Sequence, residues 1–337
     1  MVRIVRRAPG VLFALGLVVP AITPRLASAD SNDLVLSRLS TRTLDGQGNL
    51  TRAIGQNLEF RALASELGVV LAPHLLTPSD TLGFGGFQFS VDYSATTIDS
   101  GASYWRARAA SPDPADAGNQ AHGSDGMSTV GVFVRKGMWF PVPSFEIGAG
   151  AVRLLDSGIW TGQLYTKLGV HEGYHQLPLP SLAVRGAVSR MMSQRELDLT
   201  VASLDVSISK HIGVAGTWRL DPFAGWNLLM IIPRSEVIDP TPNVDSLATG
   251  NEMDAELNFV FREQDTIMRN RFFFGAKFQY SFLQLTLEAQ FALAGSSTDD
   301  RPGTSDVCMP NSTTSNCDAK DTASAQRTVS MSAGFDF

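Results

Sequence analysis

The chain has 337 residues, 44% of them hydrophobic, and a formal net charge of −6. Its length allows one large domain or two. Beyond the N-terminus no stretch of about eighteen apolar residues occurs, so transmembrane helices are excluded. The acidic balance argues against a nucleic-acid partner, because nucleic acids are bound through basic surfaces.

Residues 1–29 have the composition of a secretory signal peptide. Three arginines near the start form the charged region, apolar residues follow over 11–19, and Ala27-Ser28-Ala29 is a small-residue cleavage site. We therefore predict that the protein is exported and that the mature chain begins at Asp30.

The next segment, residues 30–81, contains one predicted helix. Apolar residues recur at helical spacing over about 58–71, with Asn57 suited to the N-cap and Pro73 ending the pattern. The preceding residues, 31–53, are polar and show no sustained period. A short amphipathic helix is therefore expected just before the strands begin.

From residue 82 onward the sequence predicts strands. In 283–293, for example, apolar residues alternate with polar ones, as expected of a strand between an apolar and a polar environment. Segments of about ten residues can cross a bilayer at the tilt of a barrel. If Glu256–Phe261 pairs separately, the strand count becomes twelve. The ten predicted strands cover about 82–98, 127–139, 143–155, 158–171, 181–193, 196–209, 221–230, 269–281, 283–294 and 325–337.

The connections differ in length in a regular way. The long ones are the first (99–126), the seventh (231–268) and the ninth (295–324), so an antiparallel meander places all three at the same end. Together they hold 17 acidic residues against six Lys and Arg. Two interpretations of this charge stay open: solvation of the loops, or recruitment of divalent cations that bridge anionic lipids.

The two cysteines of the chain, Cys308 and Cys317, lie in the ninth connection. In an exported protein this spacing predicts a disulfide that closes a small loop. No further Cys or His lies nearby, so neither a metal site nor a cofactor is expected.

The last strand is the most specific feature of the sequence. Val329, Met331, Phe335 and Phe337 lie on one face, and small or polar residues, among them Gly334, lie on the other. This strand resembles the closing strand of bacterial outer-membrane β-barrels, which typically end in phenylalanine and carry the signal read by the barrel-assembly machinery. The resemblance implies the Gram-negative outer membrane, with long loops outside the cell and short turns in the periplasm.

One catalytic pattern occurs. His171-Glu172-Gly173-Tyr174-His175 matches H-E-x-x-H, in which a helix brings two zinc-binding histidines onto one face. A predicted strand precedes it and prolines follow, which favours a polar turn. Omptin-like outer-membrane enzymes use histidine at the extracellular rim, where this chain has only His122. We therefore expect no enzymatic activity.

The predicted register directs ten charged side chains into the barrel. Five acids oppose five bases, which fits either a lumen filled by salt bridges or a narrow polar pore. The predicted lumen-lining residues are Asp92, Arg135, Glu146, Lys167, Arg185, Asp205, Arg271, Lys277, Glu288 and Asp336.

The sequence thus predicts an all-β, antiparallel transmembrane β-barrel over residues 82–337, with about ten strands or twelve. The leading hypothesis is passive passage of a small solute of unknown identity, restricted by residues 30–81 acting as a plug or a periplasmic cap. We expect the helix at the periplasmic mouth. The alternative is a structural or adhesive barrel that acts through its acidic extracellular loops. Expected partners are outer-membrane lipid and, during biogenesis, the barrel-assembly machinery.

Overall fold

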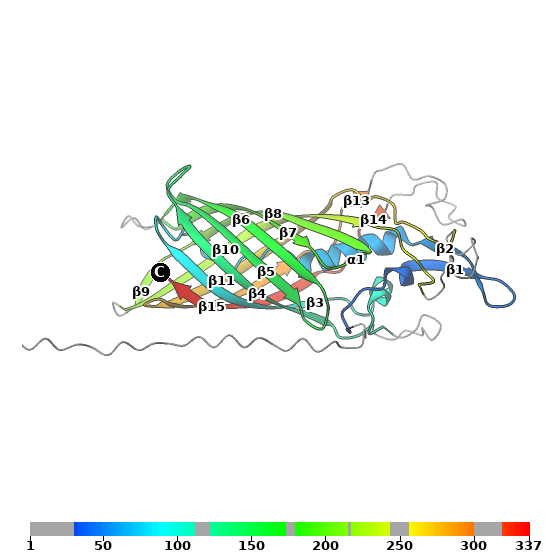
Figure 1. The fold of residues 1–337 in the computed structure, drawn as a ribbon. Helices are drawn as coiled ribbons and strands as arrows, with labels where there is room; N and C mark the ends of the chain where they lie inside the picture. Colours follow the sequence, from blue (N-terminus) through cyan, green and yellow to red (C-terminus); the bar gives the residue numbers. More distant parts are fainter. Residues whose placement is uncertain (1–29, 112–121, 173–178, 215–216, 243–255, 300–318) are drawn as a thin grey trace, which may run out of the picture.

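A computed structural model describes residues 30–111, 122–172, 179–214, 217–242, 256–299 and 319–337. They form a closed antiparallel barrel of ten strands (Figure 1). Neighbours in sequence pair throughout, and the last strand pairs with the first to close the wall. The ten strands are β3 (Phe87–Thr97), β4 (Gly126–Met138), β5 (Phe145–Leu154), β6 (Trp160–His171), β7 (Ser181–Met191), β8 (Leu197–Ser209), β10 (Trp218–Ser235), β11 (Ile267–Tyr280), β12 (Leu283–Ala292) and β15 (Gln326–Asp336).

All ten predicted strands are present, with boundaries that differ by a few residues. The largest difference is at β10, which is longer at both ends than predicted, and the short β9 (Ile212–Val214) pairs with its beginning. No strand forms over the described residues of Glu256–Phe261, where an isolated bridge joins Ile238 and Phe259. The prediction of ten strands is confirmed, and twelve is wrong.

The two faces of the wall differ in polarity, as strand alternation requires. On β12, Leu283, Leu285 and Leu287 are each 40–53% exposed on the outer face, while Thr286 and Glu288 are buried inside. The other strands also carry large apolar side chains outside, and their inner face is polar along much of its length, with apolar residues such as Leu199 and Ile231 inside toward the outer end. Such an outer surface suits lipid, and such an inner surface needs polar partners.

The ends of the barrel are unequal. The connections β3–β4 (98–125), β10–β11 (236–266) and β12–β15 (293–325) meet at one end, here called the outer end. Short turns such as 139–144 and 281–282 lie at the opposite, inner end, together with the C-terminus. Outer-membrane barrels place their long connections outside the cell, so the outer end is the extracellular one.

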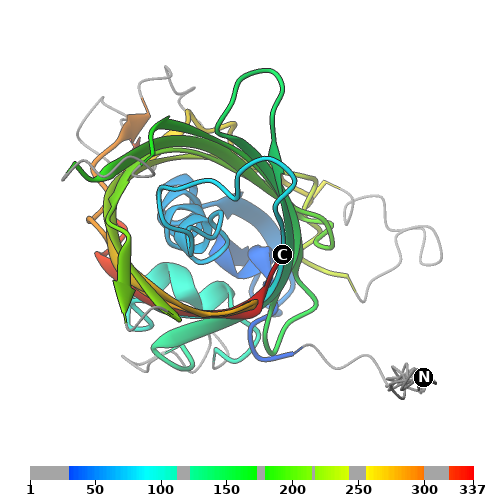
Figure 2. The ribbon, with the colours of Figure 1, turned by 90° about the vertical axis from the view of Figure 1, so that its left-hand side faces the viewer.

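The N-terminal segment begins at the outer end and runs through the barrel. It forms η1 (Leu36–Leu39) and a hairpin of β1 (Ser40–Leu44) and β2 (Leu50–Gly55), which projects beyond the strands (Figure 1). The helix α1 (Asn57–Val70) then lies inside the ring of strands, as Figure 2 shows.

Residues 71–82 continue without regular structure to the inner end, where β3 starts. The helix covers nearly the predicted residues, but Asn57 is its first residue and not its N-cap, which is Gln56, because the Asn57 side chain accepts from Arg262 N instead. Its expected place at the periplasmic mouth is also wrong. No helix in the described ranges is long and apolar enough to cross a membrane.

The main hydrophobic core is at the outer end. Apolar residues of α1, such as Leu63 and Leu67, are fully buried there with Ile231 of β10. The first long connection adds Trp105 from η2 (Ser103–Ala107), which is also fully buried. The core therefore joins the N-terminal segment to the barrel wall and to its loops.

Candidate functional site in the barrel lumen

All ten charged residues predicted to line the lumen have side chains on the inner face. Nine are at most 5% exposed, whereas Asp336 at the inner end is partly exposed. Eight of the ten form ion pairs, which compensates the burial of their charge. The four pairs are Arg135–Asp92 (3.7 Å), Lys167–Glu146 (3.2 Å), Arg185–Asp205 (2.9 Å) and Lys277–Asp336 (2.9 Å).

Five members of this set, together with Asn227, follow one another across neighbouring strands as a belt along part of the wall. The strand registers place its members directly opposite one another, and three of the neighbouring pairs are joined by a hydrogen bond or an ion pair. Arg185 Nε donates to Asp205 (2.9 Å), and Arg271 Nε donates to Asn227 Oδ1 (3.1 Å). From β5 to β11, the belt consists of Glu146, Lys167, Arg185, Asp205, Asn227 and Arg271.

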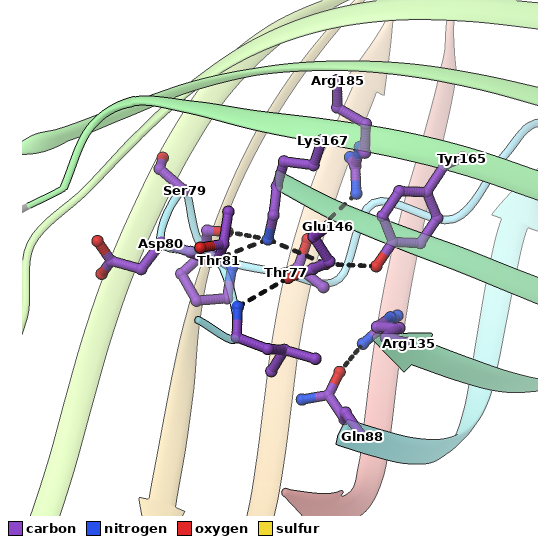
Figure 3. Close-up of polar contacts among 12 residues, drawn as sticks. Thr77, Ser79, Asp80, Thr81, Gln88, Arg135, Glu146, Tyr165, Lys167 and Arg185 are labelled. Atoms are coloured by element: carbon purple, nitrogen blue, oxygen red, sulfur yellow. Dashed lines mark hydrogen bonds and ion pairs between the residues drawn. The ribbon is translucent and has the colours of Figure 1, made fainter. Parts of the chain in front are cut away.

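The three bases of the belt also bind the polypeptide inside the lumen, and Figure 3 shows two of them, Lys167 and Arg185, beside residues 77–81. They donate to main-chain oxygens of residues 73–80, an irregular stretch whose carbonyls have no ladder partner of their own. Buried carbonyls require such donors. The contacts are Arg271 Nη2 to Pro73 O (3.2 Å), Arg185 Nη1 to Leu75 O (2.6 Å), and Lys167 Nζ to Pro78 O (3.2 Å) and Asp80 O (2.9 Å).

Other wall residues satisfy main-chain N–H groups of the same stretch. Gln163 Oε1 accepts from His74 N (3.1 Å), Glu172 Oε1 from Thr81 N (2.9 Å) and Glu146 Oε2 from Leu82 N (3.0 Å). Ser79 N donates to Ser209 Oγ (3.1 Å). Residues 57–82, here called the plug, are therefore held along the lumen by side chains of the wall.

At the outer end, one carboxylate holds α1 to two of the long connections. Glu66 is fully buried and accepts four hydrogen bonds: Tyr104 OH (2.6 Å), Trp105 Nε1 (2.8 Å), Ser324 N (3.0 Å) and Asp99 N (3.2 Å). Burial and the Glu66 charge raise the pKa of Tyr104 well above its ordinary value, so its hydroxyl stays a donor.

A second polar cluster joins the plug to the β10–β11 and β12–β15 connections. Arg61 Nη1 donates to Asp265 O (3.0 Å). Ser65 Oγ accepts from Arg269 Nη1 (2.8 Å) and donates to Asp321 Oδ2 (2.6 Å). The helix thus contacts all three long connections through buried polar groups.

Sequence reasoning missed these outer contacts. Arg269 could have been found, because it lies two residues before Arg271 and shares its inward register. The polar residues Arg61, Ser65 and Glu66 interrupt the apolar helix, which is a signal of buried polar partners. Their partners lie on distant connections, and no local pattern identifies those.

The H-E-x-x-H segment does not form a helix where the structure describes it. His171 ends β6, and Glu172 bonds Thr81 and Ser144 Oγ (2.7 Å), while His175 lies outside the described residues. His122 at the outer end is buried and bonded through Nδ1 to Ser111 Oγ (2.7 Å). Burial, with Arg106 and Arg108, lowers the pKa of His122, which keeps it neutral.

The closing strand carries the predicted assembly residues on the expected faces. Val329, Met331, Phe335 and Phe337 are 42–71% exposed on the outer face. Gly334 lies on the inner side, where an added Cβ would come within 2.1 Å of the Phe89 carbonyl oxygen. The predicted disulfide cysteines, Cys308 and Cys317, lie outside the described residues.

Comparison with known proteins gives distant structural likenesses. No family model and no curated protein matches the chain. The outer-membrane protease OmpT of Escherichia coli is 8% identical, with a TM-score of 0.31 over 79% of this chain and 99% of that one. Ail, the attachment invasion locus protein of Yersinia pestis, is 10% identical, with a TM-score of 0.26 over 75% and 99%.

OmpT of Vibrio cholerae is 9% identical, with a TM-score of 0.26, and the match covers 63% of this chain and 56% of that one. The chain thus spans little more than half the length of the Vibrio protein. Likenesses at this level say nothing about activity. The closed ten-stranded wall, its apolar outer face and its unequal ends are features of the molecule itself, and they make the chain a bacterial outer-membrane β-barrel.

Proposed function

We propose that this protein is a closed barrel that acts through its extracellular surface, as a structural or adhesive protein, and conducts little solute. The observation that carries the proposal is the filled lumen. The plug runs along it from the outer half to the inner mouth, and wall side chains bond main-chain groups in residues 73–75 and 78–82. A free pore would leave the same buried charges facing water.

The outer surface supports the same proposal because it is built from several parts. Main-chain bonds join Val35 N to Ala107 O (2.7 Å) and Asn32 N to Asp156 O (2.8 Å), so the N-terminal segment is fixed to two connections. The β1–β2 hairpin stands on this base with its side chains largely exposed. A fixed base with a projecting hairpin suits contact with something outside the cell.

The expectation that the protein is not an enzyme remains part of the proposal. Glu172 of the H-E-x-x-H segment is engaged in contacts with the plug and the 139–144 turn. The Ser111–His122 pair is buried between the first connection and the N-terminal segment, where Arg38 Nη1 donates to Ser111 O (3.2 Å). Both groups therefore have packing roles that account for their positions.

Conductance in planar bilayers tests the closed state. Wild-type protein is expected to give few or no channel openings, and a variant lacking residues 40–55 is expected to stay closed, because its plug is intact. A variant lacking residues 57–82, with a short glycine linker to Gly83, is expected to conduct. Frequent large openings of the wild type would overturn the proposal.

Adhesion of expressing cells tests the surface role. Binding to glass and self-aggregation are compared for cells with wild-type protein and with the 40–55 deletion at equal surface amounts. The deletion is expected to lower both. Equal adhesion of the two strains, and of a strain without the protein, would contradict the adhesive role.

A gated passage is the second candidate, and one observation favours it. At the inner end a polar cavity of about 250 Å³ lies between the wall and the plug, lined among others by Lys167, Lys277 and Asp336. Beyond Leu75, which packs against Phe223 and Phe273, residues 78–82 of the plug are held there by hydrogen bonds to wall side chains, and such bonds can exchange with water one at a time. A ligand-dependent rise in wild-type conductance would support this candidate over the closed barrel.

A further inference from the structure

The start of the described chain is bound to the outer end of the barrel. Arg108, 1% exposed, donates to Asn32 Oδ1, and Asn32 Nδ2 donates to Leu155 O (2.8 Å). Leu36 N donates to the carboxylate of Glu196 in the β7–β8 connection (3.2 Å). Residues 30–39 therefore rest on three different connections of the outer end, with side-chain as well as main-chain contacts.

The first barrel strand starts at the opposite end. Phe87 N donates to Phe337 O (2.9 Å), and Phe337 N donates to Phe87 O (2.8 Å), so the two ends of the barrel sequence meet at the inner mouth. Between Asp30 and Phe87 the chain must therefore pass from the outer end to the inner end. It does so inside the ring of strands (Figure 2).

The wall leaves no other path for this segment. Every barrel strand is paired on both sides, including the pair of β15 with β3 that closes the ring. Outside the wall lies lipid, where an unpaired main chain is strongly disfavoured. Outer-membrane proteins reach their membrane from the periplasm, so residues 30–56 must cross the membrane to reach their observed place.

We propose that the barrel transports its own N-terminal segment: residues 30–56 pass through the lumen to the cell surface during assembly and remain there. The proposal concerns how the segment reaches the surface and does not depend on what the surface binds. The barrel then has an export activity toward unfolded polypeptide, with its own upstream chain as the substrate.

The lumen has the chemistry for such passage. Its inner face carries small hydroxyl side chains at Ser203, Ser207, Ser330 and Ser332, each at most 5% exposed. Hydroxyl, guanidinium and carboxylate groups offer donors and acceptors to any extended main chain, with no requirement for particular side chains. The present contacts of residues 72–82 are an example of that binding mode.

The outer core gives the passage a direction. Once α1 reaches the outer half of the lumen, Leu63 and Leu67 become fully buried beside Trp105 and Ile231. Glu66 then gains its four donors. Return of the segment to the periplasm would require all of these groups to be exposed again, so the outward position is retained.

A surface-accessibility experiment tests the destination. A short epitope inserted between Asp30 and Ser31 in the full-length protein is expected to bind antibody on intact cells as strongly as on lysed cells. The matched control has the same epitope in the 139–144 turn, which should bind only after the outer membrane is permeabilised. If the epitope at Asp30 also needs permeabilisation, the proposal is overturned.

A cross-linking experiment tests the route. Ser79 Oγ of the plug lies 3.1 Å from Ser207 Oγ of β8, so S79C/S207C, in a C308S/C317S background, should form a disulfide in assembled protein. S79C and S207C alone are the controls, and heat-modifiable gel mobility checks that each variant is folded. The expected result is an epitope on the surface together with a cross-linked plug.

If the epitope is detected at the surface but folded S79C/S207C forms no disulfide, passage through the lumen is overturned. An accessible epitope together with equal adhesion of the wild type, the 40–55 deletion and a strain without the protein would instead contradict the proposed surface function and leave the transport proposal standing. The two proposals therefore fail in distinguishable ways.

Discussion

Glu66 shows how much one buried carboxylate can determine. It is the common acceptor for two side chains and two main-chain N–H groups from separate connections. Replacing it by alanine leaves those donors buried without an acceptor, which costs about 1–3 kcal/mol for each neutral group. We expect E66A to lower the unfolding midpoint in urea and to expose the plug to protease.

Two variants serve as comparisons for E66A. E66Q keeps one acceptor oxygen and is expected to be less destabilised. E59A removes the partner of Arg106 at a pair whose side chains are about one-fifth exposed, and such pairs contribute about 0–1 kcal/mol. Equal effects of E66A and E59A would mean that Glu66 does not hold the helix.

Arg185 and Asp205 offer a second test at this scale. Both side chains are at most 4% exposed, and Arg185 also binds Leu75 O (2.6 Å). Removing one member of a buried pair typically costs about 3–5 kcal/mol, because the other charge is left without compensation. R185L is therefore expected to destabilise the barrel more than R185L/D205L does.

Urea unfolding of both variants in the same detergent measures the difference, with R190L as the matched control. Arg190 pairs with Asp198 on the outer face and its side chain is 63% exposed, so its loss should have little effect. A double variant that is less stable than R185L would show that Asp205 is compensated without Arg185.

At the scale of elements, the alternation of apolar and polar residues predicted the strands well. The sequence predicted the place of the helix poorly. A strand such as β12 alternates between apolar and polar residues because one of its faces meets lipid and the other meets the polar lumen. This two-residue period can be read from the strand's own sequence. The helix over 57–70 was likewise predicted from its own spacing. The place of the helix was not predicted, because the irregular residues 71–86 can span about 3.3 Å each. They are therefore long enough to cross a membrane, and the helix can lie at either end of the barrel.

The hairpin β1–β2 was missed for a related reason. Its burial pattern does not alternate, since most of its residues are exposed on both faces. A strand without a buried face has no hydrophobic period to detect. The ten lumen residues were found because inward charges keep the strand period, but their main-chain partners in the plug belong to a segment with no period at all.

The fit of α1 in the barrel depends on Gly68. A Cβ at this position would lie 2.6 Å from Cδ1 of Ile231, which is fully buried in β10. Alanine is favoured over glycine in a helix by about 1 kcal/mol, but overpacking costs about 1–3 kcal/mol. We expect G68A to destabilise the plug and to produce channel openings.

I231A supplies the complementary change. Alone it leaves a cavity, with a cost of about 2–5 kcal/mol, whereas in G68A/I231A the new methyl group fills part of that space. The double variant is expected to be more stable than the sum of the single effects predicts. Strict additivity in urea unfolding would show that the two positions do not contact each other.

At the scale of the whole molecule, the lumen brings together the inward charges and the plug, which the sequence shows only as separate features. Five acids, five bases and one amphipathic helix are each visible in the sequence, and a pore or a filled barrel accounts for them equally well. The course of residues 73–80 along the lumen depends on long-range contacts, such as that of Arg271 with Pro73, which span about 200 residues of sequence and leave no local sequence pattern. These contacts can be predicted only after the pairing of the barrel strands is known.

The last residue, Phe337, affects the whole barrel because it helps to close the wall. Phe337 exchanges two main-chain hydrogen bonds with Phe87, and its ring stacks near Phe282 (centroids 6.4 Å apart). Deleting it removes the last pair between the first and last parts of the barrel and one aromatic ring from the inner end. We expect the deletion to lower the amount of folded protein in the outer membrane severalfold, measured by heat-modifiable gel mobility after fractionation.

Refolding separates assembly from stability. If Phe337 acts in recognition during assembly, the purified deletion variant should still fold in detergent with nearly wild-type urea resistance, because nine residue pairs of β15 with β3 are untouched. F337Y keeps the ring and the main chain and should insert normally. Normal insertion of the deletion variant would remove the assembly role, and failure to refold in detergent would show that Phe337 is needed for the barrel itself.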